Sequence, residues 1–471
     1  MDASHFDTLT AYAAINTLRL DDMRPHLYRT RDGGKTWTEI VAGIDSGAIT
    51  NVIREDPKAR GLLYAGSDRQ AWVSFDDGNH WQSLRLNMPG TSIRDLVIKD
   101  DDVVIGTHGR SFWILDNVTP LRQLGTGDRG LGTRQGSPST RGGSLGANSL
   151  PADSPVPSPQ SRLFKPQTAT RIRYSQWPDT PLPPDEPAAE NPPDGAMIDY
   201  VIGSGGTGGR PVTLEIYDGT KLVRRYTSTD TAMAPGDVGN VPRYWVRPTR
   251  VLSADPGMHR FVWDLRYPPP GVLNVQYPIS ATPNNTPREP RGPWVVPGTY
   301  TVRLTVSGQT HSQSLTVRLD PRVKASAATL ARQFTLSKGV YDAINRTRGV
   351  LDELRALRAN LRDIRARTTG ETIAAIDSLD LAAGALEGGG GGFGGGGGGG
   401  GGSPTLSGTI GTLAQLYDAL QDADVQPTTQ LVAAVEAAQR EVPATLARWD
   451  PLRARAVARF GSQLRPPGPP K

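Results

Sequence analysis

The spacing of apolar residues along the chain changes once, near Pro321. Before that point, short stretches alternate apolar and polar residues and end at Gly or Pro, which is the pattern of half-buried β-strands. After it, apolar residues recur about every three to four positions, which is the pattern of amphipathic helices. The sequence therefore predicts a mainly β chain with an α-helical tail.

The helical part begins with one long amphipathic stripe. We expect a helix from about Ser326 to Arg367, with Ser337 and Arg348 as polar interruptions of its apolar side. The stripe consists of Leu330, Phe334, Tyr341, Ile344, Leu351, Leu354, Leu361 and Ile364. Because such a stripe needs a partner to cover it, this helix must pack against other helices.

Three later segments supply those partners, at 372–386, 406–423 and 428–460. Pro443 and Pro451 are expected to break or kink the last of them. Its core positions would be Leu431, Val435, Val442, Leu446, Trp449, Leu452 and Val457. The arrangement predicts an antiparallel helical hairpin or a small bundle.

The middle of the chain shows regular short strands separated by Gly- and Pro-rich turns. The strand signals lie at 171–174, 196–202, 211–217, 221–226, 258–265, 298–306 and 309–319. Short antiparallel strands of this kind predict a β-sandwich of immunoglobulin-like type. The Pro-rich stretch 267–297 is expected to be a loop on its surface.

The N-terminal part contains a repeated motif. TRDGGKTW begins at Thr30 and SFDDGNHW begins at Ser74, so the two copies lie 44 positions apart. Both have the form [Ser/Thr]-x-Asp-x-Gly-x-x-Trp, which is the Asp-box or BNR signature of β-propellers, and a period near 44 is typical of four-stranded blades. The motif positions are Thr30, Asp32, Gly34 and Trp37 in one copy and Ser74, Asp76, Gly78 and Trp81 in the other.

A structural role explains the motif residues. The Asp side chains can accept hydrogen bonds from turn amides, and the Gly residues supply positive φ without a Cβ penalty. Each Trp can bury its large ring between sheets. We therefore interpret the Asp-box residues as structural, and not as catalytic or metal-binding groups.

The repeat also includes three equivalent short strands at 11–14, 63–66 and 104–107. They predict two to three blades, whereas closed propellers typically need about four or more. An incomplete ring would expose apolar sheet faces to water. We therefore expect the chain to be the C-terminal part of a longer protein, or another chain to close the ring.

Two low-complexity stretches separate the predicted parts. The first, at 125–161, contains hardly any large apolar residue, and the second, at 388–404, is nearly pure Gly. Both are therefore expected to be flexible linkers. The chain then divides into propeller blades (1–124), a disordered linker (125–161), a β-sandwich (162–322), a helical segment (323–387), a Gly-rich linker (388–404) and a helical segment with a Pro-rich tail (405–471).

Composition excludes several classes of protein. The 52 basic and 47 acidic residues are interspersed, so the net charge of +5 does not indicate a nucleic-acid partner. There is no Cys, and the six His lack the paired spacing of metal ligands, so we predict no metal site and no cofactor. No run of about 18 apolar residues occurs, so no membrane span is expected.

Six blocks of sequence that include the two Asp-boxes, taken in order along the chain, resemble the C-terminal part of large bacterial proteins with sortilin-like, BNR-repeat propellers. That family is often labelled "glycosyl hydrolase" because sialidases share the Asp-box. The blocks that carry the resemblance are LYRTRDGGKTWTEI (27–40), WVSFDDGNHWQSL (72–84), GTHGRSFWILDNVTPL (106–121), TPLPPDEPAAENPPDGAMIDY (180–200), MHRFVWDLRYPPP (258–270) and GPWVVPGTYTVRL (292–304). The resemblance implies a periplasmic or secreted location for the complete protein, although this chain shows no signal peptide.

A sialidase-type glycosidase needs an Arg cluster, a Tyr nucleophile with a Glu partner, and an acid/base Asp at the centre of the ring. Two to three blades do not supply that set, so the catalytic residues are unknown. Asp68, Arg69, His108 and Arg110 are candidate ligand-facing residues, with Asp116 as a further polar candidate. The other interpretation of His108 and Arg110 is a structural role at a blade junction.

We therefore expect a non-catalytic binding or scaffold protein whose propeller face takes a peptide, protein or glycan ligand. The alternative is a glycosyl hydrolase whose catalytic residues lie on blades that precede this chain. A third possibility is structural assembly at the cell envelope through the amphipathic helices.

Overall fold

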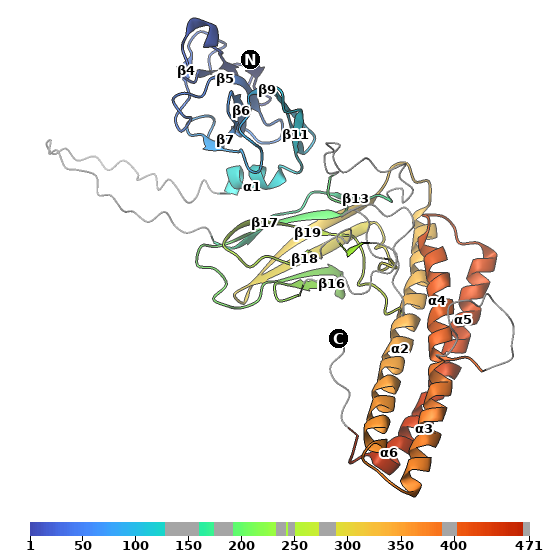
Figure 1. Ribbon diagram of the computed structural model, residues 1–471. Helices are drawn as coiled ribbons and strands as arrows, with labels where there is room; N and C mark the ends of the chain where they lie inside the picture. Colours follow the sequence, from blue (N-terminus) through green and yellow to red (C-terminus); the bar gives the residue numbers. More distant parts are fainter. Residues whose placement is uncertain are drawn as a thin grey trace, which may run out of the picture.

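The computed structural model describes residues 1–127, 160–173, 192–231, 242–243, 250–272, 289–388 and 403–464. Within these residues the chain is mostly β-sheet up to Leu319 and helical from Ala327, as the change in apolar spacing predicts. Figure 1 shows three successive parts: the N-terminal sheets in blue, further sheets in green and yellow, and helices in orange and red. No helix in the described part is long and apolar enough to cross a membrane.

The N-terminal part consists of three antiparallel sheets, one for each sequence repeat. The first contains β1 (Asp2–Ala3), β2 (Ala11–Ala14), β3 (Leu27–Thr30) and β4 (Thr38–Glu39) in that order, with the 3₁₀ helix η1 (Leu18–Leu20) between β2 and β3. The second contains β5 (Thr50–Glu55), β6 (Leu63–Ser67), β7 (Ala71–Ser74) and β8 (Gln82–Ser83). The third contains β9 (Ile93–Lys99), β10 (Asp102–Thr107) and β11 (Phe112–Leu115), with β10 in the middle.

Two apolar cores hold the three sheets together. One lies between the first and second sheets and includes Tyr12 and Ile53. The other lies between the second and third sheets and includes Tyr64 and Ile105. Because the second sheet has a core on each face, β6 and β7 are buried along their whole length. The sheets are therefore stacked, and the described residues contain no closed sheet or barrel.

The next part has two sheets around one shared core, which is the two-layer arrangement that the alternation predicts. One sheet has the order β12 (Arg162–Leu163), β14 (Ala196–Ile202), β17 (Gly257–Trp263). The other has the order β13 (Ala169–Arg171), β19 (Gln309–Leu319), β18 (Gly298–Val306), β15 (Thr213–Asp218), β16 (Lys221–Thr227). Tyr200 and Trp263 from the first sheet meet Leu214 and Val302 from the second in this core.

Three expectations for this part need correction. The strands are not all antiparallel, because β13 runs parallel to β19. The strand expected at 171–174 instead spans Ala169–Arg171. The Arg171 guanidinium is buried and donates to the Val295 carbonyl (2.8 Å). The stretch 267–297 is not simply a surface loop: residues 273–288 lie outside the described part, but Tyr267, Trp294 and Val295 are buried in the core between the two sheets.

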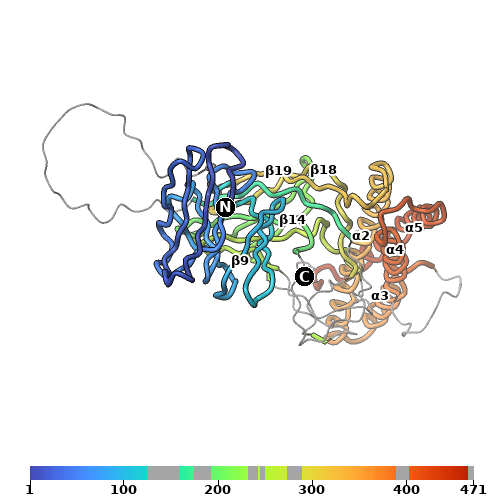
Figure 2. Tube along the Cα trace, turned by 90° about the horizontal axis from the view of Figure 1, so that it is seen from above, coloured from blue at the N-terminus to red at the C-terminus, as the bar shows by residue number. Residues whose placement is uncertain are grey.

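The C-terminal helices form a small bundle around one continuous apolar core. They are α2 (Ala327–Arg365), α3 (Glu371–Glu387), α4 (Leu406–Gln421), α5 (Thr429–Ala447) and α6 (Trp449–Phe460). The predicted stripe of α2 is buried except for Phe334, which is half-buried. Figure 2 shows the bundle at the opposite end of the molecule from the N-terminal sheets.

The last predicted helix is broken just before Pro451, one of the two Pro residues expected to break it, and it continues through the other, Pro443. Pro443 lies inside α5 without ending it, and the break falls at Arg448, between α5 and α6. This break changes which face of the final turns packs on the bundle. As a result Val457, expected in the core, is 52% exposed, and Phe460 is buried instead.

The two ends of the Gly-rich linker lie next to each other. Gly388 at the end of α3 lies against Thr405, the N-cap of α4, so closely that a Cβ on Gly388 would come within 2.2 Å of the Thr405 hydroxyl. The two helix ends are therefore held together by packing on α2, whereas residues 389–402 lie outside the described part.

We predict that shortening this Gly run has little effect on stability. Loop-closure entropy changes only slowly with length, so removing half of residues 389–402 should change the free energy of unfolding by less than about 1 kcal/mol. Thermal unfolding followed by circular dichroism checks this. A large loss of helix signal would mean that the run itself holds α3 and α4 in place.

The helix α1 (Thr119–Gly127) joins the N-terminal sheets to the sandwich. It extends through Gly127, so the linker expected at 125–161 begins later, and residues 128–159 lie outside the described part. Arg122 on α1 is buried and contacts both oxygens of Asp56 through Nε (2.9 Å each), and it also contacts Asp101. On the sandwich side, Asn117 donates to Asp199 (3.0 Å).

Candidate functional site

The first Asp-box turn joins β3 to β4. The Thr30 hydroxyl accepts from the Gly34 amide (2.9 Å) and donates to Asp32 Oδ1 (2.8 Å). Asp32 also accepts from the amide (2.9 Å) and the hydroxyl (2.6 Å) of Thr36. The hydrogen bond from the Thr36 hydroxyl is the main cause that lowers the pKa of Asp32 to about 2. Asp32 is thus an ionised acceptor whose hydrogen-bond partners, Thr30 and Thr36, belong to its own turn.

The second Asp-box turn, between β7 and β8, repeats this geometry. The Ser74 hydroxyl accepts from the Gly78 amide (2.9 Å) and donates to Asp76 Oδ1 (2.9 Å). Asp76 also accepts from the His80 amide (2.8 Å) and contacts His80 Nδ1 (2.7 Å). Burial alone would raise the pKa of Asp76, but these hydrogen bonds lower it overall. A carboxylate engaged in this way is poorly suited to acid/base chemistry.

The Gly and Trp positions of the motif connect neighbouring sheets. Gly78 has φ +85°, and a Cβ there would lie 2.5 Å from Ile40 Cδ1 of the preceding repeat, so only Gly fits. Trp81 is 4% exposed, and its Nε1 donates to the Ile40 carbonyl (2.7 Å). Trp37, at the equivalent position, is 41% exposed. The expectation that both rings pack between sheets is confirmed for Trp81 and wrong for Trp37, because the described residues place no sheet on the outer side of the first one.

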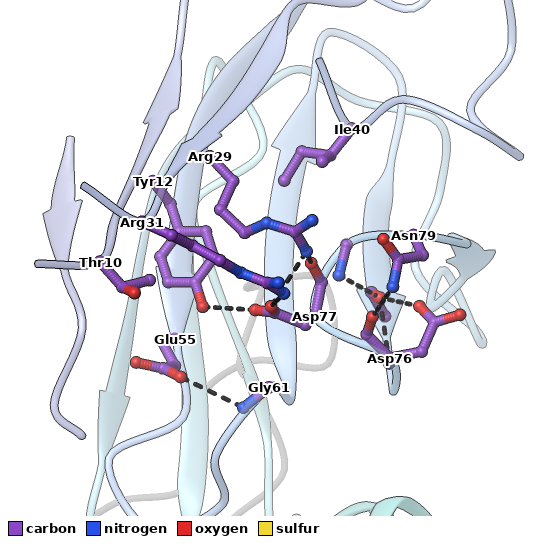
Figure 3. Close-up of polar contacts among 12 residues, drawn as sticks. Thr10, Tyr12, Arg29, Arg31, Ile40, Glu55, Gly61, Asp76, Asp77 and Asn79 are labelled. Carbon is purple, nitrogen blue, oxygen red and sulfur yellow. Dashed lines mark hydrogen bonds and ion pairs between the residues drawn. The ribbon is translucent and has the colours of Figure 1, made fainter. Parts of the chain in front are cut away.

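A polar pocket of about 280 Å³ lies between the first two sheets, beside the second Asp-box turn. Its walls consist of Ser4, Asp7, Thr10, Tyr12, Arg31, Glu55, Arg60 and Asp77. Figure 3 shows two of these side chains, Tyr12 and Arg31, converging on Asp77 together with Arg29. None of these residues is among the site residues expected from the sequence. The available signal was the second acidic residue of the motif SFDDGNHW, which the Asp-box pattern leaves unspecified.

Asp77 is the centre of this pocket. Its Oδ1 accepts from the Tyr12 hydroxyl (2.5 Å), and its Oδ2 accepts from Arg29 (2.9 Å) and from Arg31. Burial, reinforced by the hydrogen bond to Asp77, raises the pKa of Tyr12 well above its usual value. The Tyr12 hydroxyl therefore stays protonated and acts as a donor that links the first sheet to the second.

The other two carboxylates of the pocket are also satisfied. Glu55 is 1% exposed, and its two oxygens accept from the amides of His5 (3.0 Å) and Gly61 (3.1 Å). Asp7 accepts from the Thr10 hydroxyl (2.7 Å) and the Leu9 amide (3.0 Å). The hydrogen bond from Thr10 is the main cause that lowers the pKa of Asp7.

The pocket contains the residue types of a sialidase site in a different arrangement. Catalysis by that route needs a Tyr activated by a Glu, and a Tyr nucleophile is favoured by a lowered pKa. Here Tyr12 is paired with Asp77, its pKa is raised, and Glu55 is bound to two backbone amides. These contacts join the first two sheets and occupy the groups that the sialidase route would need as nucleophile and activating base.

The predicted ligand-facing residues lie at the opposite end of the sheets, where β5 and β9 begin. The loop with Asp68 and Arg69 is bonded to the third sheet through the Thr91 amide and the Arg69 carbonyl (3.1 Å). The His108 amide donates to the Ser92 carbonyl (2.8 Å), so its loop lies beside the first one. The structure thus brings together Asp68, Arg69, His108 and Arg110 from two sheets.

The loop between β2 and β3 reaches the same end of the sheets. Asn16 Nδ2 donates to Asn51 Oδ1 (2.5 Å), and Asn51 in turn donates to the Ile93 carbonyl (2.8 Å). This loop exposes Leu18 and Leu20. We call this surface the loop face and define it by Leu18, Leu20, Asp68, Arg69, His108 and Arg110.

The side chains of the loop face are only partly engaged. Arg69 is 62% exposed, and its Nε lies 3.7 Å from Asp68 Oδ2. Asp68 Oδ1 is buried and has no hydrogen-bond partner among the described residues. His108 and Arg110 are exposed. Asp116, the further polar candidate, does not belong here, because it lies at the other end of β11, where its carbonyl accepts from Arg260 (2.7 Å).

Comparison with known proteins gives no family assignment. No protein-family model matches the chain, and no curated protein matches it. Among solved structures, one similar chain is described as YCF48 bound to D1 peptide; it is 19% identical, with a TM-score of 0.17. The match covers 20% of this chain and 30% of that chain. A similarity this limited carries no argument about fold or function. The described residues also contain no group of acidic or His side chains that could hold a metal ion.

Proposed function

We propose that this chain is part of a non-catalytic, extracytoplasmic binding protein of the sortilin-like BNR-repeat propeller type. The observation that carries the proposal is the contrast between the two ends of the stacked sheets. At the Asp-box end, the carboxylates of Asp7, Glu55 and Asp77 are all occupied by internal hydrogen bonds. At the loop face, side chains from neighbouring sheets converge with few internal partners.

In this proposal the three stacked sheets are consecutive propeller blades. Two of them are four-stranded meanders of near-identical order, and each Asp-box turn closes the outer end of its sheet. The exposed Trp37 supports a further blade on the first sheet, because its counterpart Trp81 is covered by the sheet before it. Further blades, or another chain, would complete the ring.

The chemistry of the loop face favours a polypeptide or glycan with an acidic group. Arg69 and His108 offer cationic or hydrogen-bonding groups, and a guanidinium group suits carboxylates. The exposed Leu18 and Leu20 favour apolar contacts at the same surface. A peptide that carries an acidic residue next to apolar ones matches both features.

We expect the double change Arg69→Ala and His108→Ala to weaken ligand binding about tenfold or more, since charged hydrogen bonds contribute roughly 1.5–3 kcal/mol each. The measurement is retention of the purified chain on peptide and glycan arrays, followed by titration of the best ligand. Arg69 belongs to the second sheet, and His108 lies in the turn before β11, so neither change replaces a residue of β11 itself.

Lys99→Ala is the matched control. Lys99 is an exposed cation on the same group of sheets, but it lies at the opposite end of β9. Its loss should leave binding unchanged. If Lys99→Ala weakened binding as much as the double change, the ligand would be held by overall charge and the loop face would not be the site.

A further inference from the structure

Among the described residues, the third sheet has no counterpart of the fourth strand found in each of the other two sheets. In the first sheet β4 pairs with β3, and in the second β8 pairs with β7. In the third sheet β11 is the equivalent of β3 and β7, and it pairs with β10 alone. One side of β11 is therefore a free edge within the described residues.

The hydrogen-bond pattern shows which backbone groups lie on that edge. The Thr107 amide donates to the Ser111 carbonyl (3.2 Å), so this pair is a hydrogen-bonded pair of the ladder. In an antiparallel ladder such pairs alternate, so Trp113 and Leu115 also bond to β10. The amides and carbonyls of Phe112 and Ile114 consequently point away from β10, and they make no hydrogen bond to another described residue.

The side chains of the same two residues are exposed. Phe112 is 76% exposed and Ile114 is 58% exposed, while Trp113 and Leu115 pack against the core between the second and third sheets. A strand with unpaired backbone groups and exposed apolar side chains is a template for pairing with another strand.

We propose that two copies of this chain associate by antiparallel pairing of β11 with β11. The two-fold register that uses the free groups places Phe112 opposite Ile114 of the second copy, with the two Trp113 residues at the centre. It forms four new backbone hydrogen bonds, and it places the exposed Phe112 and Ile114 side chains next to each other across the joint. The two third sheets then form one six-stranded sheet.

Charge complementarity favours a second copy as the occupant of this edge. In the same register Arg110 lies beside Asp116 of the second copy, and the two-fold axis repeats this pair. Within the described part of the chain neither side chain has a hydrogen-bond partner, and burial and the nearby Asp102 raise the pKa of Asp116. Two symmetry-related ion pairs therefore flank the apolar centre.

The symmetry also limits the assembly to two chains. Each copy offers one β11 edge, and an isologous contact uses the same edge on both partners. No free β11 edge remains after pairing, so the contact ends in a closed dimer and does not continue into a fibre.

The test is the molar mass of the full chain in solution, measured by light scattering across a series of concentrations. We expect a dimer whose dissociation constant rises about tenfold or more for Arg110→Glu or for Asp116→Lys, since each places like charges opposite each other at two sites. The combined variant Arg110→Glu with Asp116→Lys restores opposite charges and should recover the dimer. A monomeric wild-type chain at all concentrations would overturn the proposal, and so would a combined variant as weak as either single one.

A backbone variant tests the pairing independently of charge. Ile114→Pro removes an amide that has no partner in the single chain, and edge strands tolerate Pro at such positions. We expect the variant to stay folded by circular dichroism but to be monomeric, whereas Val97→Asp, on the same exposed face but away from the edge, should still dimerise. A folded Ile114→Pro variant that remained dimeric would place the contact elsewhere on the molecule.

Discussion

Replacing Arg122 with alanine is expected to lower the free energy of unfolding of the N-terminal sheets by about 3–5 kcal/mol, the usual cost of removing one partner from a buried ion pair. Arg122 contacts both oxygens of Asp56, which is 0% exposed, and it also bonds to the Asp100 carbonyl (3.0 Å). Without Arg122, the Asp56 carboxylate keeps only the Lys58 amide (2.8 Å) among these contacts. Trp fluorescence during urea unfolding measures the loss.

Lys58→Ala is the control for this change. Lys58 bonds to Asp101 (2.7 Å), a carboxylate that Arg122 also contacts, but the Lys58 side chain is 52% exposed. An exposed pair contributes about 1 kcal/mol or less. Equal losses in the two variants would mean that α1 is held by surface charge and that burial of the Arg122–Asp56 pair is unimportant.

The two Asp-box Trp residues should differ sharply in their contribution to stability. Trp81→Ala removes a ring that is 4% exposed and a hydrogen bond to the Ile40 carbonyl, so we expect a loss of about 3–5 kcal/mol. Trp37→Ala alters the same motif position, but that ring is 41% exposed and should contribute about 1 kcal/mol or less. Chemical unfolding of each variant beside the wild type measures both values.

This comparison separates two views of the motif. If the Asp-box Trp stabilises only its own turn, the two changes should lower the free energy of unfolding by the same amount, because both turns have the same local hydrogen bonds. If it joins one sheet to the sheet before it, only Trp81 matters in this chain. A costly Trp37→Ala would mean that another surface covers Trp37 in solution.

Local sequence patterns predicted the elements of this protein well. The alternation in 298–306 and 309–319 predicts β18 and β19 with the bounds that the structure shows. The Gly and Asp positions of TRDGGKTW and SFDDGNHW predict the two turns, because their hydrogen bonds join residues at most four positions apart. The long stripe of α2 is equally local, since its buried positions follow from helical spacing.

Contacts between distant segments were not predictable in the same way. Tyr12 meets Asp77 across 65 positions, and Arg122 meets Asp56 across 66. The sequence shows neither pair, because their partners are chosen by how the sheets stack. The exposure of Trp37 has the same cause: the motif is identical to that of Trp81, and only the neighbouring sheet differs. The parallel pairing of β13 with β19 likewise depends on where the chain returns.

For the candidate site, the sequence predicted the polar residues of the loop face but not the polar pocket at the other end of the sheets. Asp68, Arg69, His108 and Arg110 were selected because they follow blade strands, and the structure brings them to one end of the sheets. The pocket around Asp77 was missed because its members come from four separate segments of the chain. That pocket has the composition of a catalytic site, and only its hydrogen bonds indicate a structural role.

The central claim is that this chain binds without catalysing a reaction, and hydrolysis of a panel of fluorogenic glycosides that includes sialosides tests it most directly. The purified wild-type chain and the variants Tyr12→Phe and Glu55→Gln would be compared, with folding checked by circular dichroism. We predict no release of fluorophore above the buffer rate from any of the three proteins. Release by the wild-type chain that disappears in a folded Tyr12→Phe or Glu55→Gln variant would contradict the account and make the pocket an active site.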